Sequence, residues 1–262
     1  VSEAEATSSR TEDTARKLSA TIDAGSRHFA AWNDTMAKRL QELRDKITQA
    51  RHIADSIRLS MTSIGDSGGS CVRTYEPSHL EPSTMTSIVL TYAISSQLRD
   101  ALLFYLPSSS TDDFVAIEMV NRKIRFVWDV GGGLGEVTHP LHIQTAGDLT
   151  NDQHWYRVEA QRMRNVGRLW VRPQVVSAGS ALSVGPPAVN SSAASIGRLD
   201  VGPSSRVWVG GADRRLPHRL MSTQPGLVGC LHKVELNGRP IGLWNFRTQN
   251  PNSCTACIEG YK

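Results

Sequence analysis

Residues 226–246, Gly-Leu-Val-Gly-Cys-Leu-His-Lys-Val-Glu-Leu-Asn-Gly-Arg-Pro-Ile-Gly-Leu-Trp-Asn-Phe, decide the fold class of this chain. Between Leu231 and Leu236 the side chains alternate with a period of two, which is typical of a half-buried strand. Asn237-Gly238 tolerates positive φ at both central positions of a type I′ turn, and we expect Ile241–Phe246 to return as the second strand. The segment therefore predicts a β-hairpin that carries a cysteine and no catalytic group.

Short strands of the same kind recur throughout the chain after Gly65. Most alternate and are bounded by Gly, Pro, Asn or Ser, and no helix-period segment of useful length lies among them. This pattern predicts an all-β antiparallel jelly-roll sandwich, with residues 177–195 as a long surface loop rich in Ser, Ala, Gly and Pro. The other expected strands are 87–95, 101–106, 114–120, 123–130, 155–161, 169–176, 207–210 and 230–236.

The first 64 residues show a different period. Between residues 10 and 64 there is no proline, and apolar side chains recur at alternating steps of three and four, with one stutter at Met36–Leu40. A repeat of this length favours a coiled-coil helix over an amphipathic helix packed on its own domain. The predicted seam consists of Leu18, Ile22, Phe29, Trp32, Met36, Leu40, Leu43, Ile47, Ala50, Ala54, Ile57 and Met61, with Gly25 also in register.

The seam is irregular in size. Gly25 and the bulky Phe29 and Trp32 stand where a self-complementary dimer would use Leu or Ile, so we expect partner helices of a different sequence. The predicted organisation is a coiled-coil helix over residues 1–64, a glycine- and serine-rich hinge over 65–70 and a β domain over 71–262.

All four cysteines lie in the β part of the chain: Cys71, Cys230, Cys254 and Cys257. An even number of cysteines, all within a domain of short strands, favours disulfides and an oxidising, extracellular compartment. A zinc site would need a second pair of ligands beside Cys254-x-x-Cys257, and a redox role would need a following helix. Spacing alone leaves the three possible pairings open.

The remaining signals favour binding over chemistry. The net charge of +4 permits an acidic partner such as heparan sulfate, with Arg214, Arg215 and Arg219 as the densest basic group. The sequons at Asn33 and Asn190 are candidate glycosylation sites. No nucleophile elbow, HExxH motif or membrane-length apolar run is present, so we expect no enzyme, no nucleic-acid binding and no membrane insertion.

Several motifs together resemble a laminin G-like domain, specifically the first such domain of a laminin α chain, with the end of its coiled coil in front. The resemblance extends over nearly the whole chain and is clearest from about residue 40 onward. The residues that carry it are Val72-Arg73-Thr74-Tyr75, Leu102–Leu106, Asp113–Met119, Phe126–Gly131, Trp155–Val158, Val207–Gly211, Gly229-Cys230 and Ile241–Phe246.

The resemblance implies a concanavalin-like jelly roll in a secreted basement-membrane protein. The helix would assemble with laminin β and γ chains into a heterotrimer, and integrin binding would need further G-like domains together with the γ-chain tail. The resemblance implies that Cys230 pairs with Cys257 or Cys254 and that Cys71 pairs with the cysteine that remains, and we favour Cys230–Cys257 with Cys71–Cys254. Some members bind calcium at the rim of the sandwich, which would place calcium at Asp113 or Asp112, with Asp200 as a guess for the second ligand. The alternative function is a secreted glycan- or protein-binding jelly roll whose helix self-associates.

Overall fold

The computed structural model describes most of the chain as two compact units, residues 1–53 and 54–262, which are considered separately below. The described residues are 2–55, 57–63, 70–94, 100–144, 155–174, 185–193, 197–212, 220, 226–255 and 257.

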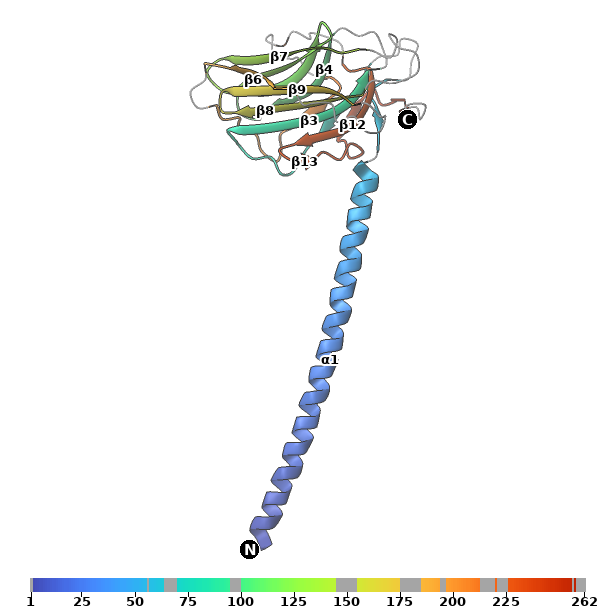
Figure 1. Ribbon diagram of the computed structural model, residues 1–262, viewed down its shortest axis with the longest axis vertical. Coiled ribbons are helices and arrows are strands. Elements are labelled where there is room, and N and C mark those ends of the chain that lie inside the picture. Colours follow the sequence, from blue (N-terminus) through green and yellow to red (C-terminus); the bar gives the residue numbers. More distant parts are fainter. Residues whose placement is uncertain are drawn as a thin grey trace. The chain divides into compact units, whose positions relative to one another are not determined.

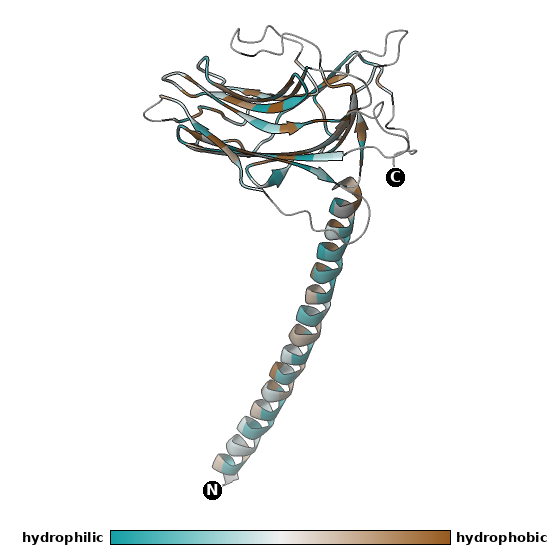
Figure 2. Cartoon of the chain, turned by 45° about the horizontal axis from the view of Figure 1, so that its top comes forward, coloured by the Kyte–Doolittle hydropathy of each residue, from teal (hydrophilic) through white to brown (hydrophobic). Residues whose placement is uncertain are grey.

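The first unit is a single helix, α1 (Ser2–Asp55), whose 54 residues span about 80 Å at 1.5 Å per residue (Figure 1). Its first turn carries Glu3 and Glu5, which favour the positive end of the helix dipole. Further along, Lys38 pairs with Asp34 one turn before it. Figure 2 shows apolar residues recurring among hydrophilic ones along its length.

The helix ends earlier than predicted, at Asp55 instead of residue 64. Leu59–Ser60 forms strand β1, which pairs antiparallel with β12 (Gly229–Leu236). Met61 follows with no exposed surface, and its amide donates to the carbonyl of Gly229 at 2.8 Å. The assignment of Met61 and Ile57 to a coiled-coil seam is therefore wrong, because sheet pairing and core burial stabilise this segment instead. The β domain begins at Leu59, ahead of the predicted start at Cys71.

The second unit is a sandwich of two seven-stranded antiparallel sheets, as predicted (Figure 1). One sheet has the order β1-β12-β3-β8-β9-β10, with β13 also paired to β12, and the other has the order β14-β2-β11-β4-β5-β6-β7. The remaining strands are β2 (Val72–Tyr75), β3 (Met85–Ile94), β4 (Ala101–Pro107), β5 (Phe114–Val120), β6 (Lys123–Asp129), β7 (Leu134–His142), β8 (Trp155–Met163), β9 (Val166–Gln174), β10 (Ala188–Ser191), β11 (Val207–Val209), β13 (Arg239–Pro240) and β14 (Thr248–Asn250).

The β-hairpin predicted around Asn237-Gly238 is confirmed at its turn, but its second strand is shorter than predicted. Leu236 pairs with Arg239, and Asn237 and Gly238 have φ of 53° and 74°, as a type I′ turn requires. The return strand β13 contains only Arg239–Pro240, so the expectation of a strand over Ile241–Phe246 is wrong. The Ile241 amide still donates to the Val234 carbonyl at 2.8 Å, and the chain then leaves the sheet as Ile241 and Leu243 enter the core.

Five strands fall where none was expected: β1, β2, β7, β10 and β14. Strand β10 lies inside the predicted loop 177–195, and β7 contains Pro140. Both lie at the end of the strand order of their sheets, where a proline or a short polar strand is tolerated. Much of the rest of that loop lies outside the described residues.

The main core fills the space between the sheets, and Trp128 on β6 lies within it, fully buried. Glycines on two neighbouring strands leave room for its ring. A Cβ at Gly167 on β9 would lie 2.3 Å from the ring, and one at Gly135 on β7 would lie 2.1 Å from it. The run Gly131-Gly132-Gly133 forms the turn between the antiparallel strands β6 and β7 at positive φ, which glycine adopts without strain.

Candidate functional site

Eight apolar side chains form a stripe along α1 that no described residue of the helical unit covers. Their exposed fractions lie between 38% for Met36 and 64% for Phe29. Ala50 is also exposed, whereas Ala54 is partly buried just past this unit. We call the eight residues the apolar stripe: Leu18, Ile22, Phe29, Trp32, Met36, Leu40, Leu43 and Ile47.

The apolar stripe is suited to association with other helices. Covering a large apolar side chain contributes roughly 1.5–3 kcal/mol, so a helix that leaves eight of them in water gains considerably from partner helices. The Phe29 and Trp32 rings lie next to each other, with centroids 6.0 Å apart, and a Cβ at Gly25 would meet nothing within 4 Å. Bulk at one level and space at another favour partners of complementary sequence.

Two disulfides hold the C-terminal segment of the sandwich. Cys71 is bonded to Cys254 and Cys230 to Cys257, which is the pairing that the resemblance implied. The Thr255 amide also donates to the carbonyl of Thr62 at 2.8 Å. The segment that follows β14 is thereby fixed beside the segment that follows β1.

The Asp113 carboxylate lies on the β4–β5 loop, at one rim of the sandwich. Ser108 of this loop binds backbone carbonyls: its amide donates to the Asp113 carbonyl at 2.7 Å, and its hydroxyl donates to the Asp200 carbonyl at 2.6 Å. Ser110 donates to the Asp200 carboxylate. The two loops predicted to share a calcium ion are therefore in contact, but the part of the chain that the structure describes contains no group of three or more acidic, His or Cys side chains suited to a metal. Calcium binding stays a prediction.

A buried arginine organises this rim from below. Arg162 on β8 is 1% exposed, and its guanidinium donates to the carbonyls of Ser83, Arg164 and Gly197 and to the hydroxyl of Thr86. Burial lowers the pKa of Arg162 to about 10, and the charge of Asp113 opposes part of that shift. Arg162 stays charged at neutral pH, and its hydrogen bonds connect three loop and turn segments of the sandwich.

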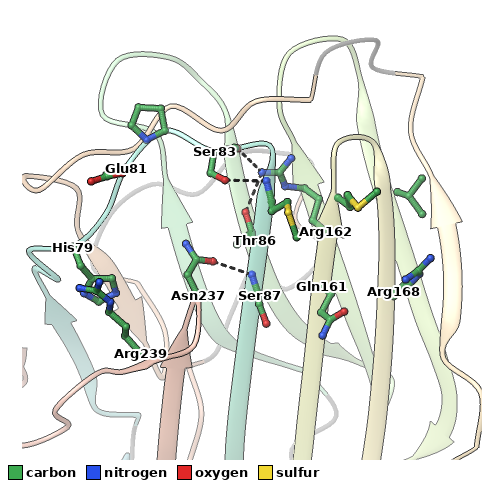
Figure 3. A pocket seen from close by; sticks show the side chains of 14 residues that line it. His79, Glu81, Ser83, Thr86, Ser87, Gln161, Arg162, Arg168, Asn237 and Arg239 are labelled. Carbon is green, nitrogen blue, oxygen red and sulfur yellow. Dashed lines mark hydrogen bonds between the residues drawn. The ribbon is translucent and has the colours of Figure 1, made fainter.

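A cavity of about 740 Å³ opens beside this arginine on the sheet that contains β3, β8 and β9 (Figure 3). Its walls combine exposed methionines with cationic and amide side chains. The lining residues on strands are Met85, Thr86, Ser87, Gln161, Arg162, Met163, Val166, Arg168 and Arg239, and those on the neighbouring loop and turn are His79, Glu81, Pro82, Ser83 and Asn237.

The other predicted sites are placed as follows. Asn33 is exposed on α1, and Asn190 is exposed on β10, where its amide nitrogen donates to the Glu136 carbonyl at 2.7 Å. Arg214, Arg215 and Arg219 lie outside the described residues. Over the described ranges, no helix is long and apolar enough to cross a membrane.

The two-sheet sandwich, the disulfide-fixed end and the open cavity define a class: a disulfide-bonded jelly-roll binding module that follows a helix with an uncovered apolar stripe. Comparison with known proteins identifies the family. The family model described as Laminin G domain matches residues 94–239. The chain belongs to the laminin G domain family, as the motifs indicated.

Similarity to laminin α chains extends beyond the matched domain. The chain is 30% identical to human laminin subunit alpha-1 over 226 residues, which is 86% of this chain and 7% of the relative. The mouse protein of the same name is 30% identical over 188 residues, covering 72% of this chain and 6% of that one. The chain thus spans less than a tenth of the curated relatives it matches.

Solved structures agree with the fold. The structure of the LG1-3 region of the laminin alpha2 chain is 32% identical, with a TM-score of 0.57, over 73% of this chain and 34% of the other. The mouse laminin alpha1 LG4-5 structure is 15% identical, with a TM-score of 0.53, over 72% and 43% of the respective chains, which supports the fold alone.

The cavity and the role of Arg162 were missed by sequence reasoning. The cavity is lined by residues from four strands, a loop and a turn, and no spacing along the chain predicts that they come together. A signal was present only for Met85 and Met163, which fall on the polar side of their alternating strands and are 60% and 61% exposed.

Proposed function

We propose that this chain is a structural and adhesive module of a secreted laminin α-type protein of the basement membrane. Its helix joins laminin β and γ chains in a heterotrimeric coiled coil, and its sandwich forms part of a receptor-binding head. Laminin G domains are structural and binding modules and not enzymes, and the proposal includes no catalytic step.

The observation that carries the proposal is the apolar stripe in front of a laminin G domain. Eight large side chains, spaced by three or four residues apart from one step of seven across Gly25, are exposed by 38% or more on a helix of 54 residues. Such a face is stable in water only when it is covered by other helices. The similarity to laminin α chains, which includes most of this chain, supports laminin β and γ chains as the partners.

In this proposal, binding of a receptor requires domains and chains beyond this one. Integrin binding would need further G-like domains and the γ-chain tail, so the isolated chain would show no detectable integrin affinity. Heparan sulfate contact at Arg214, Arg215 and Arg219 and glycans at Asn190 and Asn33 remain parts of the proposal that separate binding and mass measurements can test.

Sedimentation velocity tests the proposed assembly. The chain alone should sediment mainly as a monomer, and an equimolar mixture with coiled-coil segments of laminin β and γ chains should form a 1:1:1 complex. Leu43→Gln, within the apolar stripe, should weaken that complex at least about tenfold, because it removes one buried side chain. Glu42→Gln, one position away on the exposed face, is the matched control. A stable homo-oligomer that does not bind the β and γ segments would instead support a self-associating helix on a glycan- or protein-binding module.

A further inference from the structure

The cavity of Figure 3 has an unusual composition for a sheet surface. Met85 and Met163 lie directly opposite each other on β3 and β8, and Val166 is opposite Met163 on β9, so three apolar side chains stand in one row. Both methionines are about 60% exposed. Thioether side chains are flexible and polarizable, which suits the binding of aliphatic groups of varied shape.

Positive charge surrounds this apolar row. Arg168 on β9 and Arg239 on β13 line the cavity at the two sides of the sheet, and the buried Arg162 lies between them (Figure 3). Glu81 is the one carboxylate among the described lining residues. Three guanidinium groups against one acid make the cavity suited to an anionic ligand.

The cavity wall also contains unused hydrogen-bonding capacity. Arg162 is 1% exposed, and its four donated hydrogen bonds all go to uncharged oxygens. Its Nε and the Nε2 of His79 are buried without a hydrogen-bond partner. No printed hydrogen bond of Arg162 goes to a carboxylate, so its buried charge adds to the positive potential of the cavity.

We propose that this cavity binds an extended acidic peptide segment in which aliphatic side chains stand between two carboxylates. Arg168 and Arg239 bind the carboxylates, and the row of Met85, Met163 and Val166 receives the aliphatic groups. The described lining residues include no Phe, Tyr or Trp ring on which a sugar could stack. The exposed arginines stand apart, with the polar side chains of Gln161 and Ser87 between them, and the apolar row lies beside this line, two residues along the strands. Both features favour a peptide over a sulfated glycan.

The spacing of the carboxylates follows from the sheet. From β13 across β12, β3 and β8 to β9 there are four interstrand steps, which is about 19 Å at about 4.8 Å per step. An extended peptide covers about 20 Å in six residues, and residues two apart share a face. The matching ligand has acids at positions 1 and 7 and aliphatic residues at positions 3 and 5. This site is separate from the apolar stripe, so it goes beyond the proposed assembly and can fail independently of it.

The probe is the blocked heptapeptide acetyl-Glu-Ser-Leu-Ser-Leu-Ser-Glu-amide, titrated into the full chain labelled with ¹³C at the methionine methyl groups. The signals of Met85 and Met163 should shift with a common saturating curve and a dissociation constant below about 1 mM. The signal of Met61, fully buried in the core, should not move. The isomeric peptide with Glu and Leu exchanged, acetyl-Leu-Ser-Glu-Ser-Glu-Ser-Leu-amide, should bind at least about fivefold more weakly.

Variants assign the contacts. Arg168→Gln and Arg239→Gln should each weaken binding about tenfold, because each removes a charge-assisted hydrogen bond. Lys233→Gln removes the same charge from β12 outside the cavity and should change binding by less than about twofold. Equal effects of all three variants, no saturable shift, or a heparin hexasaccharide that saturates these methyl signals while the peptide does not would overturn the proposal.

Discussion

Replacing Gly167 by alanine should loosen the sandwich, because it places a methyl group against a ring that has no space to move. The new Cβ would lie 2.3 Å from the Cη2 and Cζ3 atoms of Trp128, whereas carbon atoms pack at about 3.5 Å. Ring and strand must therefore separate by about 1.2 Å. Trp128 is fully buried, and the centroid of the Phe126 ring is 5.2 Å from its own, so the displacement spreads into the core.

The expected cost follows from these contacts. Overpacking of this kind destabilises a core by about 1–3 kcal/mol. The reduced freedom of the unfolded chain returns about 0.4–1 kcal/mol. A net loss of about 1–2 kcal/mol should lower the melting temperature by several degrees, at about 2–4 °C per kcal/mol for a unit of this size.

Urea denaturation of a double-mutant cycle is the decisive assay. The close contacts of Gly167 are with the six-membered ring of the indole. Trp128→Phe removes the bicyclic ring and should recover at least about 1 kcal/mol of the Gly167→Ala loss. Gly202→Ala is the matched control, because a Cβ there would meet nothing within 4 Å, and it should change stability by less than about 0.5 kcal/mol. A neutral Gly167→Ala, or an equal loss in the Trp128→Phe background, would refute the packing argument.

Three other outcomes are expected. Replacing the Cys230–Cys257 pair by serine should lower the free energy of unfolding by up to about 3.6 kcal/mol, and replacing Cys71–Cys254 by up to about 5.3 kcal/mol. These values follow from the loop-entropy relation for separations of 27 and 183 residues. Equal denaturation midpoints in guanidinium chloride would contradict this order. Arg125 binds the fully buried Glu118 on one side and the half-exposed Glu136 on the other. Glu118→Ala should therefore lower the free energy of unfolding by about 3–5 kcal/mol, and Glu136→Ala by less than about 1 kcal/mol. Thermal melts that show the reverse order would exclude the buried pair as the stabilising one. Burial lowers the pKa of His139; since the unfolded chain then binds the proton more readily, the contribution of His139 to stability should decrease as the pH falls below about 6.5, and an NMR titration midpoint above that value would contradict the direction.

The sandwich was predictable because its strands are short, alternate with a period of two and end at turn residues. Asn237-Gly238 predicted both the place and the type of one turn, and the structure confirms both. The errors occurred where another force decides. Pro140 hid β7 because proline is tolerated only at positions such as an edge strand, and a sequence does not show which strand lies at the edge.

The end of the helix could not be predicted from its period. Ile57 and Met61 continue the spacing of the apolar stripe, yet Met61 lies fully buried in the sandwich core. A buried apolar residue fits a coiled-coil seam and a sandwich core equally well, and only the pairing of β1 with β12 shows that this segment belongs to the sandwich. The cavity escaped prediction for a related reason. Arg168 and Arg239 are 71 positions apart in the sequence, counted from their numbers, and come together only through the strand order.

The central claim is that α1 is stabilised by partner helices. Circular dichroism at 222 nm tests it directly when the segment of residues 1–55 is mixed with laminin β and γ coiled-coil segments. The apolar stripe predicts that this segment alone is poorly helical and that the mixture has more helical signal than the sum of the separate spectra. A mixture whose spectrum equals that sum would contradict the claim.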